Sequence, residues 1–71
     1  MKILYENRDG TMVAMDAVSI LAIQNPDDDL WRVVACPVGS GYGDVVARDL
    51  TEKDAKNIVR KLFDYGVYTG V

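Results

Sequence analysis

The chain has 71 residues, with 8 Lys or Arg against 11 Asp or Glu, no His and a single Cys, and 49% of its residues are apolar. This length suits one small domain, residues 1–71, rather than two. Without His the chain lacks an imidazole base, a Ser-His-Asp triad and the Cys and His ligands that zinc sites usually need. We therefore expect a protein that is not an enzyme and that holds neither a metal nor a cofactor.

The single Cys bears on both stability and compartment. Domains this small usually need a disulfide, a metal ion, an efficient core or a partner subunit to stay folded. Cys36 has no second Cys to pair with inside one chain, so a homo-oligomer is a candidate, and a lone Cys is typical of a reducing compartment. Charged residues follow Met1 too closely for a signal peptide, and the apolar run 17–23 is too short to span a membrane. We expect a cytoplasmic protein.

Short runs of alternating or β-branched apolar residues predict strands at about residues 2–6, 11–15, 18–24, 30–36 and 44–48. The Asp9-Gly10 pair favours a hairpin turn between the first two, because Gly tolerates a positive φ. Asp16-Ala17 is expected to interrupt or bend the chain before the third strand. Asn25-Pro26 and the three Asp residues after it predict a reversal of the chain.

Apolar residues follow a helical period in the last part of the chain. The spacing i, i+3, i+4, i+7, i+8 predicts a helix at about residues 52–65, whose buried face carries Ala55, Ile58, Val59, Leu62 and Phe63. Thr51 is the expected N-cap and Gly66 the expected C-cap. The tail after Gly66 is expected either to fray or to add an edge strand.

Together these elements predict an α+β fold, in which an antiparallel sheet of four or five strands carries one C-terminal helix on one face. The strand at 18–24 directs Ile20 and Ala22 to one side of the sheet and Leu21 and Ile23 to the other. One helix covers one face, so the second apolar face needs another partner. Trp and Tyr often anchor protein interfaces. The candidate interface residues are therefore Leu21, Ile23, Trp31, Tyr42 and Tyr68.

A Gly-rich segment, Gly39, Ser40, Gly41, Tyr42 and Gly43, is the candidate ligand site. Such loops let backbone N–H groups approach a phosphate closely. A dinucleotide fingerprint needs a third Gly where this chain has Asp44, and it needs a helix where a strand is expected. A flexible hairpin is the main interpretation. The alternative is a nucleotide or another small ligand, with Tyr42 stacked on a base.

Charge clusters give no clear site. Asp27, Asp28 and Asp29 are adjacent, so they do not all point at one ion, and we interpret them as a solvated turn rather than a metal site. Residues 51–65 hold four basic and three acidic residues, a charge of +1, and the rest holds four basic and eight acidic, a charge of −4. Nucleic acid is therefore not an expected partner, because such surfaces are normally basic.

Four short segments, in this order along the chain, resemble short uncharacterised proteins of bacteria and their phages: Asp9-Gly10-Thr11, Asp16-Ala17-Val18-Ser19, Trp31-Arg32-Val33 and Thr51-Glu52-Lys53-Asp54-Ala55. The resemblance spans nearly the whole chain and carries over no functional residue. It implies a small accessory protein, and phage-encoded inhibitors of host machinery, including immune systems, are one known class in that setting.

Three hypotheses of function follow from the sequence. The first is a non-catalytic protein–protein interaction module that associates with itself. The second is a small-ligand or nucleotide binder that uses the loop 39–43, and the third is an inhibitor of a host protein or immune system. No membrane is expected among its partners.

Overall fold

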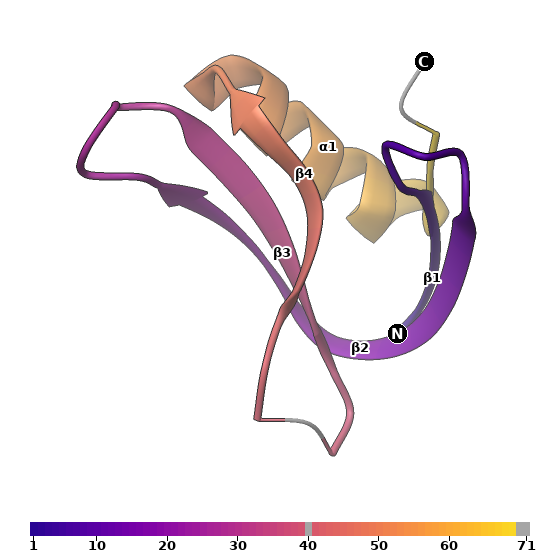
Figure 1. Ribbon diagram of the computed structural model, residues 1–71. Helices are drawn as coiled ribbons and strands as arrows, with labels where there is room; N and C mark the ends of the chain where they lie inside the picture. The colour runs from indigo at the N-terminus through magenta and orange to yellow at the C-terminus, as the bar shows by residue number, and fades with distance from the viewer. Residues whose placement is uncertain (40, 70–71) are drawn as a thin grey trace.

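The computed structural model describes residues 1–39 and 41–69. Its elements follow the order β1 (Lys2–Glu6), β2 (Met12–Gln24), β3 (Trp31–Pro37), β4 (Asp44–Leu50), α1 (Glu52–Tyr65) and β5 (Val67–Tyr68). The five strands form one sheet in the order β4-β3-β2-β1-β5, and α1 packs against one face of it (Figure 1). The α+β fold expected from the sequence is confirmed. In the described part of the chain, no helix has the length and apolar content needed to cross a membrane.

β2 is a single strand of 13 residues that takes part in both halves of the sheet. Its first part pairs with β1, from Glu6↔Met12 to Lys2↔Asp16. Its second part pairs with β3 as far as Gln24↔Trp31, after a bulge between Ala17 and Ser19. Because a bulge bends its strand and increases the local twist, β2 curves here and the sheet wraps around α1 (Figure 1).

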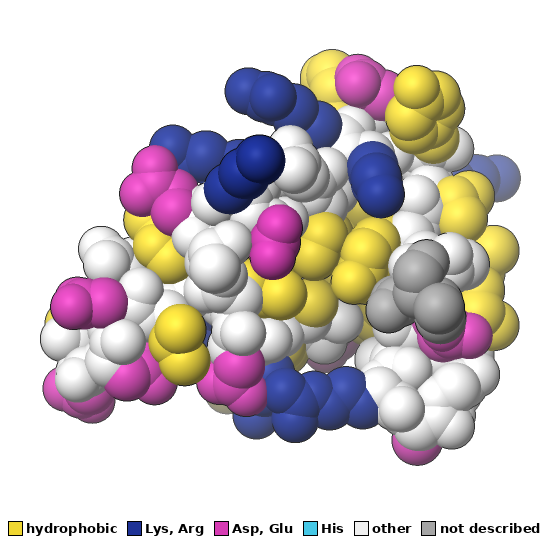
Figure 2. Space-filling model, turned by 90° about the horizontal axis from the view of Figure 1, so that it is seen from above, with side chains coloured by type: hydrophobic (Ala, Val, Ile, Leu, Met, Phe, Trp, Pro, Cys, Tyr) yellow, Lys and Arg dark blue, Asp and Glu magenta, His cyan; other side chains and the backbone are white. Residues whose placement is uncertain are grey.

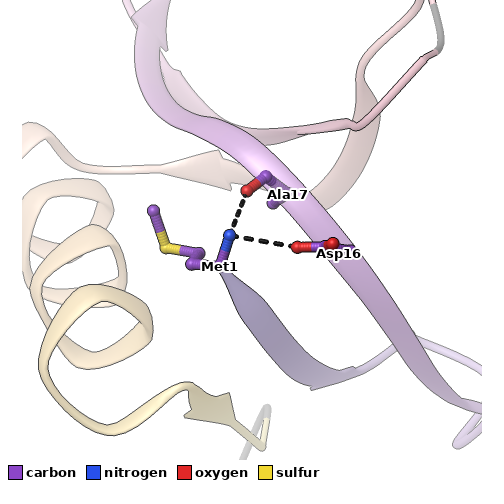
Figure 3. A network of polar contacts seen from close by, with 3 residues as sticks. All are labelled: Met1, Asp16 and Ala17. Atoms are coloured by element: carbon purple, nitrogen blue, oxygen red, sulfur yellow. Dashed lines mark hydrogen bonds and ion pairs between the residues drawn. The ribbon is translucent and has the colours of Figure 1, made fainter.

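The expectation of two separate strands at 11–15 and 18–24 is therefore wrong. The chain bends at Asp16-Ala17 but stays hydrogen-bonded on both sides, because Ala17 N–H donates to Met1 O at 2.6 Å and Asp16 O accepts from Val38 N–H at 2.9 Å. The ammonium group of Met1 also donates to Ala17 O at 2.6 Å and to Asp16 Oδ1 at 3.1 Å (Figure 3). These contacts support the bend without breaking the strand.

β5 adds an edge strand, which is one of the two outcomes expected for the tail. It lies parallel to β1, with Leu4↔Val67 and Tyr5↔Tyr68 as partners, so the antiparallel sheet has one parallel pair at this edge. Parallel neighbours need a long connection between them. Here α1 is part of that connection, because it carries the chain from β4 at one edge of the sheet to β5 at the other.

The first turn and both helix caps are as expected. Gly10, with φ of 86°, donates its N–H to Asn7 O at 3.0 Å, which closes the turn between β1 and β2. Thr51 Oγ1 accepts the N–H of Asp54 at 3.2 Å at the start of α1. Gly66 N–H donates to Leu62 O at 2.9 Å at its end.

The apolar face of α1 is narrower than the sequence pattern suggests. Ala55, Ile58 and Leu62 are buried against the sheet and Val59 is half-buried, but 73% of Phe63 is exposed. The assignment of Phe63 to the buried face is wrong, because successive helical residues lie about 100° apart and this places Phe63 well to one side of Leu62. The Lys and Arg side chains of α1 are exposed, and basic and acidic side chains alternate over the surface seen from above (Figure 2).

The core lies between α1 and the concave face of the sheet. It receives side chains from β1 to β4 and from α1, which are Ile3, Tyr5, Ala17, Val33, Ala35, Val46, Ala55, Ile58 and Leu62. As the alternation along 30–36 predicts, Val33 and Ala35 share this face, and the half-buried Trp31 packs against it.

A larger side chain at the bend of β2 should destabilise the fold. Ala17 is fully buried beside the bulge, so Ala17→Val should lower the free energy of unfolding by about 1–3 kcal/mol through overpacking. Ala14→Val adds the same methyl groups at an exposed position of the same strand and should change it by less than about 0.5 kcal/mol. Urea unfolding followed by circular dichroism measures both. Equal losses in the two variants would contradict tight packing at the bend.

Candidate interaction surfaces

The face of the sheet opposite α1 carries a row of apolar side chains. Leu21 on β2 pairs with Val34 on β3, and Val34 pairs with Val45 on β4. Directly paired residues of antiparallel strands share a face of the sheet, so these three side chains form one row. Ile23 pairs with Arg32 on one side of the row, and Ser19 pairs with Cys36 on the other. We call Leu21, Ile23, Val34, Cys36 and Val45 the uncovered face.

Exposure varies along the uncovered face. Leu21 is 45% exposed and Val34 only 8% exposed, while Ile23, Cys36 and Val45 are half-buried. The sheet curves toward α1, so the uncovered face is the convex one (Figure 1). An apolar patch that stays open to solvent and is flanked by polar groups is typical of an interaction site.

Gly43 explains why Val34 is buried without a helix above it. A Cβ atom built on Gly43 would overlap Val34 Cγ1 and would lie 3.4 Å from Cys36 Sγ. The backbone just before β4 therefore lies against Val34, and this approach requires the absence of a side chain at position 43. The backbone at Gly43 thus covers the part of the uncovered face around Val34, and the part around Leu21 stays exposed to solvent.

The structure separates the candidate interface residues of the sequence. Leu21 and Ile23 lie together on the uncovered face, whereas Trp31 and Tyr68 are half-buried against the core on the opposite side. Lys56 Nζ lies 5.8 Å from the centre of the Trp31 ring, a cation–π contact that also covers Trp31. Tyr42, in the connection between β3 and β4, is 85% exposed.

Sequence reasoning did not name Val34, Cys36 and Val45 as interface residues. The alternation along 30–36 was the available signal for Val34 and Cys36, because it places both on the side of Arg32. No such signal existed for Val45, since two irregularities in the pairing of β3 with β4 decide which residues of β4 share each face.

The candidate ligand loop differs from a dinucleotide-binding loop. Of its residues, Ser40 lies outside the described part of the chain, and Gly43 packs on Val34. The loop leads into β4 rather than into a helix, so the N–H groups of its described residues do not meet the positive end of a helix dipole. It connects the antiparallel strands β3 and β4.

In the acidic turn between β2 and β3, side-chain oxygens accept hydrogen bonds from backbone N–H groups of the turn itself. Asn25 Oδ1 accepts the N–H of Asp27 at 3.1 Å, and Asp28 Oδ1 accepts the N–H of Leu30 at 3.0 Å. Asn25 N–H also donates to Leu30 O at 2.7 Å, which closes the hairpin. Within residues 1–39 and 41–69 no three His, Cys, Asp or Glu side chains gather closely enough to hold a metal ion.

A groove runs between the β1–β2 turn and β4. It consists of two overlapping hollows of about 360 and 380 Å³, which share Asn7, Arg8, Val46, Ala47 and Arg48. Buried Val46 contributes an apolar floor, and half-buried Leu50 and Tyr68 line one end. Arg8 Nη2 bonds to Asp49 Oδ2 at 2.9 Å and so connects the two walls. A concave, partly apolar hollow of this size falls in the range of ligand pockets, about 300–1,000 Å³.

Comparison with known proteins adds no relative to this picture. No protein-family model, no curated protein and no solved structure matches the chain. The uncovered face and the groove are therefore the features that bear on function.

Replacing Gly43 with alanine should lower the stability of the folded protein. Gly43→Ala should cost about 1–3 kcal/mol of unfolding free energy, because the new Cβ and Val34 Cγ1 compete for one space. Gly41→Ala is the matched control, since a Cβ there meets no atom within 4 Å. Thermal and urea unfolding of both variants measure the difference. If Gly43→Ala were as stable as the control, the close approach at Val34 would be refuted.

Alkaline pH should weaken the fold through Tyr5. Burial, with a smaller contribution from the negative charge of Asp44, raises the pKa of Tyr5 above its ordinary value of 10.0. Above pH 10.0 this tyrosine is deprotonated in the unfolded chain but still protonated in the folded one, so stability falls as pH rises toward the folded-state pKa. Unfolding free energies between pH 9 and 12 should fall less steeply in Tyr5→Phe. Tyr65→Phe, at an exposed ring, should keep the wild-type slope.

Proposed function

We propose that this protein is a non-catalytic interaction module that binds a second copy of itself through the uncovered face. The observation that carries the proposal is the apolar row Leu21–Val34–Val45, whose Leu21 end is open to solvent while α1 occupies the other face. Covering this row removes apolar surface from water, which is the main driving force of protein association.

The register of the strands supports a two-fold arrangement. Two copies related by a two-fold axis along the apolar row place that row against its counterpart, which makes the interface isologous. The same rotation sets Arg32 of each copy over the uncharged Ser19–Cys36 pair of the other copy. The arginines of the two copies are thereby kept apart, so this packing involves no repulsion between them.

The size of the uncovered face limits the strength of the association. Three strands at about 4.8 Å spacing, each about seven residues of about 3.3 Å, give a flat area of about 300 Å². A standard stable interface buries about 800 Å² on each partner. We therefore expect an equilibrium between monomer and dimer that depends on concentration, with a dissociation constant in the micromolar range or weaker.

A charge placed on Leu21 tests the proposal. Sedimentation velocity from about 1 µM to 1 mM should show a dimer for the wild-type chain, and Leu21→Asp should remain a monomer, since the new carboxylate would be buried without a partner. Phe63→Asp is the control, because Phe63 is an exposed apolar residue of α1, away from the uncovered face, and it should dimerise like the wild type. A wild-type chain that is monomeric at 1 mM, or equal effects of both variants, would overturn the proposal.

A further inference from the structure

β4 is an edge strand with a free side. In the sheet formed by the described residues, β4 stands at the end of the strand order and its one neighbour is β3. Among residues 1–39 and 41–69, no backbone group outside β3 is hydrogen-bonded to residues 45–48. Free N–H and C=O groups at a sheet edge are a ready template for an added strand.

The groove lies along this free side. Val45, Val46, Ala47 and Arg48 all line it, and the β1–β2 turn forms the opposite wall. A strand added to β4 would lie about 4.8 Å from it, within the groove, and its side chains could reach the apolar floor at Val46.

Charges along the groove indicate what such a segment carries. Asp49 already accepts from Arg8, and Asp9 Oδ1 accepts the N–H of Thr11 at 2.9 Å. Arg48 makes no hydrogen bond or ion pair with another described residue, and it lines both hollows, one of them together with Asp9 and the other together with Glu6. Arg48 is the charged residue among positions 45–48, so a carboxylate directly opposite it on an added strand would form a cross-strand charge pair.

We infer that the groove between the β1–β2 turn and β4 binds a short, extended peptide segment as an added strand on β4, with an acidic side chain opposite Arg48. This site shares Val45 with the uncovered face, but it lies along the free side of β4, two strands away from Leu21 on β2. It recognises backbone through the free side of β4 and charge through Arg48.

Irregularities in β4 restrict the length of the segment. The pairing with β3 shifts register on each side of Val33, and Asp49 has φ of 58°, in the left-handed region. Bulges of this kind bend an edge and prevent it from pairing with another long, flat strand. The groove thus accepts a few residues of extended chain rather than the edge of another sheet.

The Arg8–Asp49 ion pair joins the two walls of the groove only weakly. Both side chains are exposed, so their ion pair contributes little to stability and is screened by salt. An incoming segment can displace this ion pair at small cost. Binding should weaken as ionic strength rises, because salt screens the pair between the segment's carboxylate and Arg48.

Nuclear magnetic resonance of the full chain tests this inference with three blocked pentapeptides, TVEVT, TVKVT and TPEPT. TVEVT should shift the amide resonances of residues 45–48 and slow their hydrogen exchange. TVKVT should bind about two- to fivefold more weakly, in line with one cross-strand charge pair. TPEPT should bind more weakly than TVEVT, because its two prolines lack the N–H groups that a strand donates and only its other residues can donate to β4.

Reversing the charge of Arg48 tests whether this side chain recognises the charge of the peptide. In Arg48→Glu the preference should invert, so that TVKVT binds more tightly than TVEVT. Arg60→Glu, the same change at an exposed position of α1, should keep the wild-type preference. Leu21→Asp should also keep it, because Leu21 lies on β2, which β3 separates from β4. No shift at residues 45–48 with millimolar TVEVT, or an unchanged preference in Arg48→Glu, would overturn the inference.

Discussion

The bend of β2 at Ala17 is the constraint on which the rest of the structure depends. One strand pairs with β1 before the bend and with β3 after it, and the bulge between Ala17 and Ser19 turns the second part relative to the first. The sheet becomes concave on one side, and a single helix of 14 residues can then close the core. Ala17 is fully buried at this point, so the bend tolerates only a small side chain.

The same curvature shapes both candidate surfaces. The uncovered face exists because α1 packs on the concave side, which leaves the convex side of β2, β3 and β4 without a helix. The curvature also brings the β1–β2 turn toward β4, and the ion pair between Arg8 and Asp49 joins the two across 41 positions of sequence. The edge of β4 is free because β4 is the last strand in the order, and the bend of β2 places the groove beside it.

In this small domain, short segments of backbone bury part of the apolar surface and leave the rest exposed to solvent. Because Gly43 has no side chain, the backbone there can pack directly on Val34, whereas Leu21 in the same row is exposed to solvent. The bulges of β4 likewise limit its free edge without covering it. What remains accessible is a short apolar row and a short stretch of edge, which suits reversible and weak contacts better than a permanent assembly.

The sequence by itself determined the local features. The period of apolar residues located α1, Thr51 and Gly66 marked its ends, and Asp9-Gly10 marked the first turn, because each depends on contacts within a few residues. The alternation along 18–24 and 30–36 separated Leu21 from Ile20 and Val34 from Val33 correctly, but it did not show which face of the sheet α1 covers. Only the tertiary structure decided that β2 is one strand, that β5 lies parallel to β1, and that Phe63 stays outside the core. These features depend on pairings and packing between residues far apart in the chain, such as Ala17 with Met1 and Tyr5 with Tyr68, and no local pattern encodes them.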